Sequence, residues 1–312
     1  MLDLHRLRLL RELKHRGTLG AVAEALSYSP SAISQQLSVL EREVGLTLLE
    51  PVGRRVRLTP QAEILVAHTE AVLERLERAE ADLAASLVEI TGTLRVAVFQ
   101  TAAFALLPDA LTELRRTHPG LRVQVVQAEP ETALPALLAR DFDLVVTEEY
   151  PGSPVPRPAE IEHAELCEDE IRLALPPGAH PAELADRPWV MEPAGSAARQ
   201  WATTLCRAAG FEPDVRFESS DVLLHLRLAR QGHAVALLPD LVWAGGTPEV
   251  ELRRLPEGRR TRRIFTAARR GGGAHPAVAA CRDALRRAVR CGGTAGSDRP
   301  VLLEPGSFPR GG

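Results

Sequence analysis

The stretch Leu26–Gly45 reads LSYSPSAISQQLSVLEREVG and places a polar, serine- and glutamine-rich run inside a helical pattern. Ser29 is a good N-cap and Pro30 suits the first helical position, so a helix is predicted to begin there. Gly45 is the residue expected just beyond its end. Apolar residues recur on one face at Ile33, Leu37, Leu40 and Val44. The pattern predicts an amphipathic helix whose polar side faces outward.

The outward face of this predicted helix carries small polar side chains where a solvated helix would more often carry charges. It offers Ser31, Gln35, Ser38 and Arg42, with Ser34 at its flank. Glutamine can pair with adenine, and serine can donate or accept a hydrogen bond at a base edge or a phosphate. Taken alone, the helix fits a plain solvated face as well as a surface that contacts DNA bases.

The segments around this helix favour the second interpretation. Leucines at helical spacing from Leu4 to Leu13 predict a first helix that stops at Gly17, and a second, short helix follows from Thr18. Downstream, TLLEPVGRRVRLTPQAE predicts a two-stranded hairpin that turns at Gly53 and carries three arginines. Three helices followed by a basic hairpin form a winged helix-turn-helix. In that fold the third helix enters the major groove and the wing contacts the DNA backbone.

Charge is distributed unevenly along the 312 residues. Residues 1–60, which hold the predicted winged helix-turn-helix, carry nine Lys/Arg and six Asp/Glu, a balance of +3, whereas the whole chain carries −3. Lys14 is the only lysine, so the other basic side chains are arginines, the better bidentate ligands for phosphate. Small binding modules often show this kind of asymmetry.

Residues 1–90 resemble the DNA-binding end of LysR-type transcriptional regulators. The runs AVAEALSYSPSAISQQLSVLEREVGLTLLE and GRRVRLTP carry the resemblance. The family usually has Leu-Phe-x-Arg where this chain has Leu48-Leu49-Glu50-Pro51, so the wing lacks one usual phosphate-contacting arginine. The residues predicted to contact DNA are Thr18, Ser29, Pro30, Ser31, Ser34, Gln35, Gln36, Ser38, Arg54, Arg55 and Arg57.

A linker helix is predicted over residues 61–90, which contain neither proline nor glycine. A heptad rhythm indicates a seam at Leu65, Thr69, Val72, Leu76, Ala79 and Leu83. The other faces hold seven acids and two arginines and are predicted to be solvated. The seam favours a homodimer, which would read a pseudo-palindromic operator; the alternative is a helix that lies on the core of its own domain. The resemblance implies this dimer and, with further contacts, a homotetramer.

Residues 91–290 alternate strand and helix patterns, which predicts a parallel sheet in an α/β fold. We expect two α/β subdomains with a cleft between them. The first comprises about residues 91–160 with 267–290, and the second about 161–266.

The runs RVAVFQTAAFALLP, DFDLVVT and RQGHAVALLP resemble the LysR effector domain, which has the type-2 periplasmic-binding-protein fold. The resemblance therefore implies that a small-molecule effector binds in the cleft. Beyond this region, residues 291–312 are rich in Gly, Pro and Ser and are predicted to be disordered.

The effector site is predicted from the positions at which the expected strands end. In α/β sheets ligands bind at the carboxyl ends of strands, beside helix N-termini that favour anions. The candidate residues are Gln100, Thr101, Glu129, Thr147, Gly195, Ser196 and Arg199. Glu148 and Glu149 favour an amine, so an acid, an amine and an amphoteric metabolite all remain open. Ser196 is better explained as a helix N-cap, and the alternative for Arg199 and Glu148 is that both are solvated surface residues.

Other functional classes find little support in the sequence. It contains no G-x-S-x-G, H-E-x-x-H or P-loop motif, so an α/β enzyme is disfavoured, and no cofactor is expected. A metal-responsive winged-helix repressor would need a Cys/His cluster near the linker, where only His68 appears. The four cysteines lie far apart, as reduced thiols would. No apolar run approaches the length of a membrane span, and we expect a cytoplasmic protein for which RNA polymerase is a possible partner.

Base reading by the third helix is testable with Gln35→Ala. This change should weaken binding to the specific site by about 1–3 kcal/mol and binding to random DNA much less, because only base contacts carry sequence information. Titration of both DNAs measures the difference. Equal losses on the two DNAs would refute base reading by Gln35.

Overall fold

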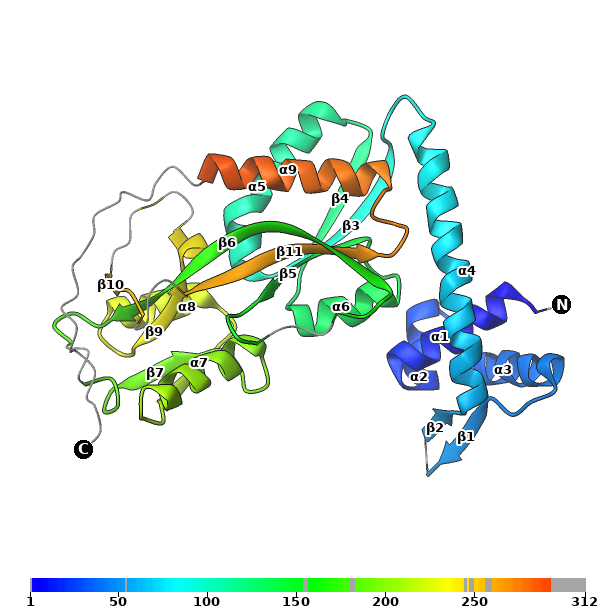
Figure 1. The fold of residues 1–312 in the computed structure, drawn as a ribbon, viewed down its shortest axis with the longest axis horizontal. Coiled ribbons are helices and arrows are strands. Elements are labelled where there is room, and N and C mark those ends of the chain that lie inside the picture. Colours follow the sequence, from blue (N-terminus) through cyan, green and yellow to red (C-terminus); the bar gives the residue numbers. More distant parts are fainter. Residues whose placement is uncertain are drawn as a thin grey trace.

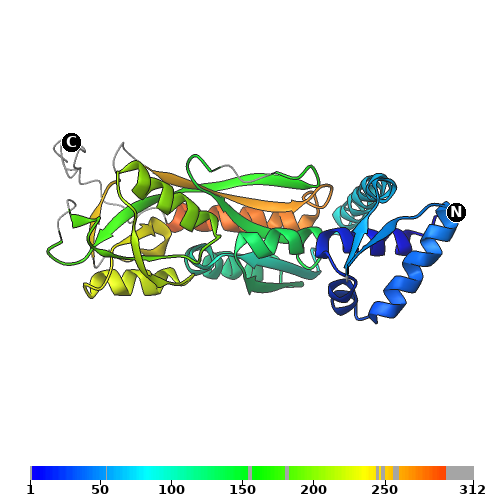
Figure 2. The same ribbon diagram turned by 90° about the horizontal axis from the view of Figure 1, so that it is seen from below.

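The computed structural model describes residues 2–53, 55–153, 157–179, 183–243, 246, 250–255 and 260–292. Figure 1 shows an N-terminal head, a larger α/β domain, and the long helix α4 (Pro60–Ala85) that stands beside both. The molecule is elongated, with the head at one end of the α/β domain (Figure 2).

The head is a winged helix-turn-helix, as predicted. Its elements are α1 (Leu4–Arg16), α2 (Leu19–Leu26), α3 (Pro30–Val44), β1 (Leu49–Val52) and β2 (Arg55–Leu58). Asp3, Thr18 and Ser29 cap the three helices, each accepting a backbone N–H bond three residues on. Apolar side chains from all three helices and from the start of α4 form one core, which includes Ile33 and Leu37. This core fixes which face of α3 stays outside.

Helix α4 ends at Ala85, five residues before the expected end at residue 90. Ser86 follows it, and its hydroxyl donates to the Leu83 carbonyl, 2.7 Å away. Such local bonds compete with continued helix, which is why serine is common at helix ends. The linker helix is therefore shorter than its proline- and glycine-free run.

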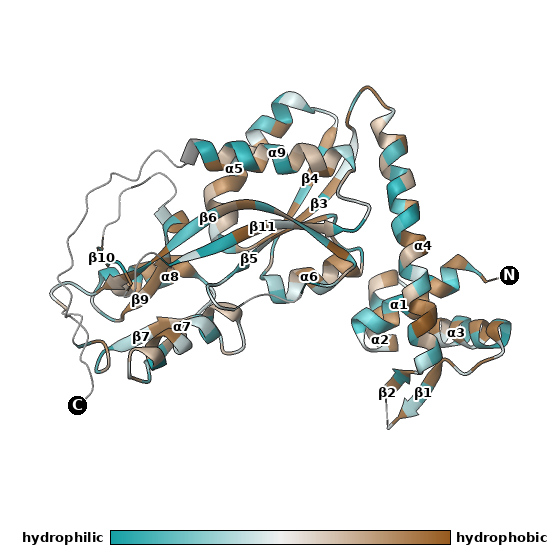
Figure 3. Cartoon of the chain, viewed as in Figure 1, coloured by the Kyte–Doolittle hydropathy of each residue, from teal (hydrophilic) through white to brown (hydrophobic). Residues whose placement is uncertain are grey.

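Two faces of α4 carry apolar side chains, and they differ in how much of these side chains is buried. Val66 and Leu73 are buried, and predicted seam residue Thr69 lies with them at 1% exposure. By contrast, Val72 and Leu76 remain 47% and 41% exposed. Figure 3 shows both hydrophobic and hydrophilic residues along this helix. One face of the helix thus packs on its own chain, as the alternative interpretation expects, and another presents an open apolar stripe.

The C-terminal domain is built on one large sheet. Among the described residues its strand order is β10-β6-β11-β5-β3-β4, with β9 paired beside β6. The elements are β3 (Gly92–Val98), α5 (Gln100–Thr117), β4 (Leu121–Gln127), α6 (Pro130–Leu138), β5 (Leu144–Glu149), β6 (Ile161–Leu175), β7 (Pro188–Met191), α7 (Ala197–Ala208), β8 (Asp214–Glu218), α8 (Val222–Arg230), β9 (Ala236–Pro239), the short 3-10 helix η2 (Asp240–Trp243), β10 (Glu251–Arg253), β11 (Thr261–Arg269) and α9 (Pro276–Gly292).

The sheet is mixed, so the expected parallel sheet holds for only part of it. Strands β3, β4 and β5 are parallel to one another. Strand β11 is antiparallel to β5, and β6 is antiparallel to β11. The long strands β6 and β11 carry the chain out to the second subdomain and back again, and therefore run in opposite directions (Figure 1).

The expected subdomain boundaries at residues 161 and 266 also need correction. Ile161 packs in one core with Ala97, and Ile264 packs in another core with Val96. Both β3 residues belong to the first subdomain. That subdomain therefore includes the start of β6, and the returning strand β11 belongs to it from before residue 267. A 15-residue strand such as β6 is long enough to serve both cores.

Each subdomain has helices packed on the sheet. In the first, α5 and α9 share a core on one face, and α6 packs on the other face. In the second, α7 packs around Trp189 and Trp201, while α8 packs against β9. No helix within the described residues is long and apolar enough to cross a membrane. From residue 293 onward, the tail predicted to be disordered lies outside the described residues.

Arginine side chains dock the head and the sheet on the carboxyl end of α6. The carbonyl of Leu138 accepts a hydrogen bond from Arg11, and that of Ala139 accepts one from Arg16 at 3.2 Å. Arg269 of β11 donates to the Leu137 carbonyl at 3.0 Å. The last carbonyls of a helix lack intrahelical partners and form its negative pole, so they favour cations.

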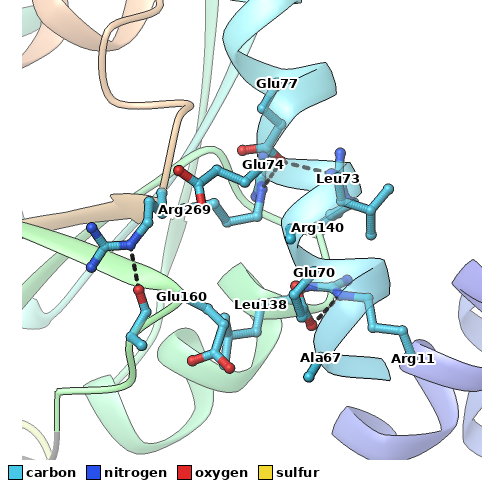
Figure 4. A pocket seen from close by; sticks show the side chains of 13 residues that line it. Arg11, Ala67, Glu70, Leu73, Glu74, Glu77, Leu138, Arg140, Glu160 and Arg269 are labelled. Atoms are coloured by element: carbon cyan, nitrogen blue, oxygen red, sulfur yellow. Dashed lines mark hydrogen bonds and ion pairs between the residues drawn. The ribbon is translucent and has the colours of Figure 1, made fainter. Parts of the chain in front are cut away.

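A second contact joins α4 to the C-terminal domain through Glu77. This carboxylate is only 6% exposed, because it pairs with Arg269 and with Arg140, the latter at 2.9 Å. The prediction that the acids of this helix are solvated is therefore wrong for Glu77. A cavity of about 270 Å³ lies beside the contact, lined by residues of α1, α4 and the C-terminal domain (Figure 4).

The turn after β11 approaches α4 so closely that it needs glycine. A Cβ on Gly271 would lie 2.7 Å from the Glu74 carbonyl, and its φ of 88° is left-handed. Gly210 has a similar φ of 90°, but nothing lies within 4 Å of its Cβ position. An alanine at either position would thus adopt a left-handed backbone, but only an alanine at 271 would also collide with the Glu74 carbonyl.

We predict that Gly271→Ala destabilises the full chain more than Gly210→Ala does. Both changes should cost about 1–2 kcal/mol for a left-handed alanine, and Gly271→Ala about 1–3 kcal/mol more for overpacking. Thermal unfolding of the two variants measures the difference. Equal shifts would contradict the contact between α4 and this turn.

Candidate DNA interface and effector site

The exposed face of α3 carries the predicted DNA-reading side chains. Ser31, Ser34, Gln35 and Ser38 are all exposed, while Ile33, Leu37 and Leu40 are buried on the opposite side. Ser29 caps the helix and also lies 2.9 Å from the Ser31 hydroxyl. Pro30 is the first residue of α3 and is exposed. The helix therefore presents a continuous polar surface with hydroxyl groups and one amide.

Two further predicted residues border this face. Thr18 is exposed and caps α2, accepting the backbone N–H of Ala21 at 3.1 Å. Gln36 is half-buried, and its carbonyl oxygen accepts a long bond of 3.5 Å from Arg6. Gln36 is thus partly engaged inside the head, whereas Gln35 is open to a ligand.

The wing is a hairpin in which Glu50 faces Arg57 across the two strands. Their side chains form an ion pair of 2.9 Å, with Arg57 72% exposed. Exposed pairs of this kind contribute about 0–1 kcal/mol, so DNA phosphate can compete for the guanidinium. Of the other two wing arginines, Arg54 lies outside the described residues, and only the backbone of Arg55 is described.

The predicted effector residues gather at the junction of the two subdomains, around one buried guanidinium that the sequence reasoning missed. Arg262 is 3% exposed and pairs with Asp169 at 2.7 Å and with Glu148. It also donates to the Thr101 hydroxyl at 2.6 Å, and its guanidinium lies 5.1 Å from the centre of the Phe99 ring. The interpretation of Glu148 as a solvated surface residue is therefore wrong.

Two side chains bridge the subdomains directly. The amide of Gln100 donates to the Asp221 carboxylate and accepts the Val222 backbone N–H at 2.7 Å. On the other side of the junction, the Glu131 carboxylate accepts the backbone N–H of Ala197 at 3.0 Å. These bonds hold the first turns of α8 and α7 against the first subdomain.

Carboxylates crowd the same junction. Burial and the charges of Glu148, Glu131 and Glu192 raise the pKa of Glu129 to about 7. Burial also raises the pKa of Glu192 above its ordinary value. Thr147 is 3% exposed, and its hydroxyl has no hydrogen-bond partner in the part of the chain that the structure describes.

The remaining predicted residues lie at the start of α7. Gly195 is exposed with a φ of 100°, and Ser196 caps the helix by accepting the Arg199 backbone N–H at 3.1 Å. The N-cap interpretation of Ser196 is thus confirmed. Arg199 is half-buried and donates to the Glu192 carbonyl at 3.1 Å, which corrects its interpretation as a solvated residue.

Signals for the missed residues were present in the sequence. Arg262 occupies the same inward phase of its strand as Ile264 and Ala268, and a charge in such a phase indicates a buried partner. Glu192 directly follows β7, so the strand-end rule used for Thr147 also selects it. Asp169 lies in the middle of a strand and gives no comparable signal.

Metal and thiol chemistry find no support in the parts of the chain that the structure describes. There, no three His, Cys, Asp or Glu side chains are grouped so as to hold a metal ion. Burial raises the pKa of the Cys167, Cys206 and Cys281 thiols to about 12. Such thiols are protonated at neutral pH and are poor nucleophiles.

Comparisons with known proteins agree with the two-part architecture. Residues 4–63 match the family described as bacterial regulatory helix-turn-helix protein, lysR family. Residues 88–290 match the LysR substrate binding domain. The transcriptional dual regulator GltC of Bacillus subtilis (strain 168) is 27% identical over 83% of this chain and 89% of its own length. A probable hydrogen peroxide-inducible genes activator of Mycobacterium xenopi is 33% identical over 56% of this chain and 89% of its own length.

Solved structures share the fold. Full-length OxyR from Pseudomonas aeruginosa, a variant form, superposes with a TM-score of 0.65 at 20% identity, covering 92% of this chain and 95% of that one. Full-length CbnR in complex with its target DNA gives a TM-score of 0.51 at 22% identity, covering 92% and 100%. Members of this family are transcriptional regulators, not enzymes. The chain belongs to the LysR family and is a DNA-binding transcriptional regulator with a C-terminal effector-binding domain.

Proposed function

We propose that the chain binds double-stranded DNA by placing α3 in the major groove. The observation that supports this most directly is the polar, uncharged face of Ser31, Ser34, Gln35 and Ser38, which is exposed on a helix whose other face forms the core of the head. Ser29 and Pro30 set the start of that helix, and Thr18 lies beside it at the start of α2. The wing contributes Arg57, and by sequence Arg54 and Arg55, to the DNA backbone.

The partner for the open stripe of α4 is a second copy of the chain. Leu76 and Leu83 are 41% and 70% exposed, on a helix whose buried face is already occupied. A two-fold pair of such helices buries both stripes and supplies the second head that a pseudo-palindromic operator requires. A homotetramer needs further contacts between effector domains. The CbnR complex shows a full-length relative on its target DNA.

The effector is a small molecule that binds at the subdomain junction. Thr101, Glu129 and Thr147 from the first subdomain meet there with the start of α7 from the second. Peroxide sensing, which the Mycobacterium xenopi relative's name describes, is not carried over, because the described thiols have pKa values raised to about 12. A regulator of bacterial promoters works in the cytoplasm, where RNA polymerase is an available partner.

Genome-wide mapping of bound DNA tests this function. The wild-type chain should enrich a limited set of sites that share a two-fold sequence pattern, and Gln35→Ala should lose them. Genes beside those sites would also identify the class of effector. Enrichment without any shared sequence would overturn the proposal of a specific operator.

Dimerisation through α4 is testable with Leu76→Glu. A charge in the apolar stripe should shift the chain from dimer towards monomer, because an unpaired carboxylate is costly to bury. Leu223→Glu on α8 is the matched control, since Leu223 is 39% exposed. Light scattering measures the mass of both variants. If Leu76→Glu keeps the wild-type mass, the dimer contact lies elsewhere.

A further inference from the structure

Two sets of donors at the junction, the Arg262 guanidinium and the first N–H groups of α7, are already engaged within the chain. Every nitrogen of Arg262 donates to Asp169, Glu148, Tyr150 or Thr101. At the start of α7, the N–H groups that would favour an anion bond to Glu131 and to the Ser196 hydroxyl. A carboxylate or phosphate arriving here would have to displace existing bonds.

Negative charge, in contrast, is left over. Asp169 and Glu148 together already exceed the single charge of Arg262. Glu129 stands at the N-cap position of α6 without making a cap hydrogen bond. Glu192 approaches from the second subdomain, and its charge raises the pKa of both Glu129 and Glu148. Two carboxylates from opposite subdomains therefore act on one another, and the charges of Arg262 and Arg199 do not return either pKa to its ordinary value.

A buried hydroxyl without a partner among the described residues lies at the same place. Thr147 lies two residues after Val145, which packs beneath α6 beside Ala133. Alternation along the strand puts Thr147 on the same face. Because α6 leads through a short loop into β5, the end of that strand lies under the beginning of the helix, where Glu129 stands. The buried Thr147 hydroxyl, which has no partner among the described residues, is thus directed towards the Glu129 carboxylate.

We propose that the effector carries an organic ammonium group, held between Glu129 and Glu192 with the Thr147 hydroxyl as a further acceptor. An ammonium donates up to three hydrogen bonds and neutralises the surplus charge. A bare metal ion fits less well, since no metal-binding group of three ligands occurs among the described residues. This inference rests on the effector site proposed above and assigns its chemical class.

The test compares ligands of the same carbon skeleton and opposite charge on the full-length chain. Alkylammonium and alkyldiammonium ions from ethyl to hexyl are the probes, with the matching carboxylates as counterparts, and thermal shift and calorimetry as readouts. At least one ammonium should stabilise the wild-type chain more than its carboxylate counterpart. Glu129→Gln and Glu192→Gln should each weaken that binding about tenfold or more, the loss of one charged hydrogen bond.

Two further variants separate a binding role from a structural one. Glu165→Gln makes the same change at an exposed position of β6 and should bind like the wild type. Thr147→Val should leave ligand-free stability unchanged or raised, because the hydroxyl makes no bond to lose, while ammonium binding falls. Glu129→Gln should also raise ligand-free stability by removing a charge repelled by Glu131, Glu148 and Glu192.

The pH dependence gives a second readout with opposite signs for the two ligand classes. Glu129, with its pKa raised to about 7, faces Glu131 on its own helix, Glu148, Glu192 and Arg262. Raising the pH through about 7 ionises it, so ammonium binding should strengthen with rising pH. Carboxylate binding should weaken over the same range. In Glu129→Gln the slope should be flatter.

The outcomes distinguish this inference from the effector site on which it rests. A stabilising carboxylate whose effect is lost in Thr101→Val would overturn the charge assignment and keep the site. Stabilisation by magnesium or calcium chloride that Glu129→Gln abolishes would overturn the organic class. An ammonium effect that survives in both Glu129→Gln and Glu192→Gln would overturn the placement. The absence of binding by either class would overturn the inference and the site together.

Discussion

A guanidinium that is removed from water must be neutralised where it lies, and Arg262 imposes this constraint on the whole C-terminal domain. Its partners come from three other elements: Glu148 lies near the end of β5, Asp169 in the middle of β6, and Thr101 in the first turn of α5. Removal of one partner from a buried ion pair typically costs about 3–5 kcal/mol, because the other charge stays buried. The network therefore fixes how β6 and β11 cross and where the first turn of α5 lies. The proposed effector site lies beside these elements.

Local structure could be predicted from the sequence, whereas long-range pairings such as those of Arg262 could not. The periodicity of α3, its Ser29 cap and its Gly45 stop are local, so its boundaries and its exposed face were predictable. The Arg262 network joins residues up to 161 positions apart, and no local pattern pairs them. Strand β6 was expected to lie wholly in one subdomain, because periodicity describes a strand without telling which core it serves.

Helix α4 shows a second limit of local patterns. Its heptad rhythm predicts one seam, yet Val72 and Leu76 of that rhythm are exposed and Thr69 is buried. Composition alone predicts that the acids of this helix are solvated. Glu77 is buried instead, because it pairs with Arg140 and Arg269, which lie far from it in the sequence. A pattern of one helix cannot show what the rest of the chain brings against it. Such pairings appear only in the folded structure.

Helix α6 connects the two regions that function requires. It has only nine residues, and both of its ends carry charge that suits its dipole: Glu129 and Glu131 at the start, Arg11 and Arg16 of the head at the end. At the start, burial among other carboxylates outweighs the dipole, which contributes up to about 2 kcal/mol at partly buried positions, and the pKa of Glu129 rises to about 7. At the end, arginines of the head bind carbonyls that have no other partner within the helix. The head and the proposed effector site thus contact opposite poles of one short helix, so α6 connects them by direct packing.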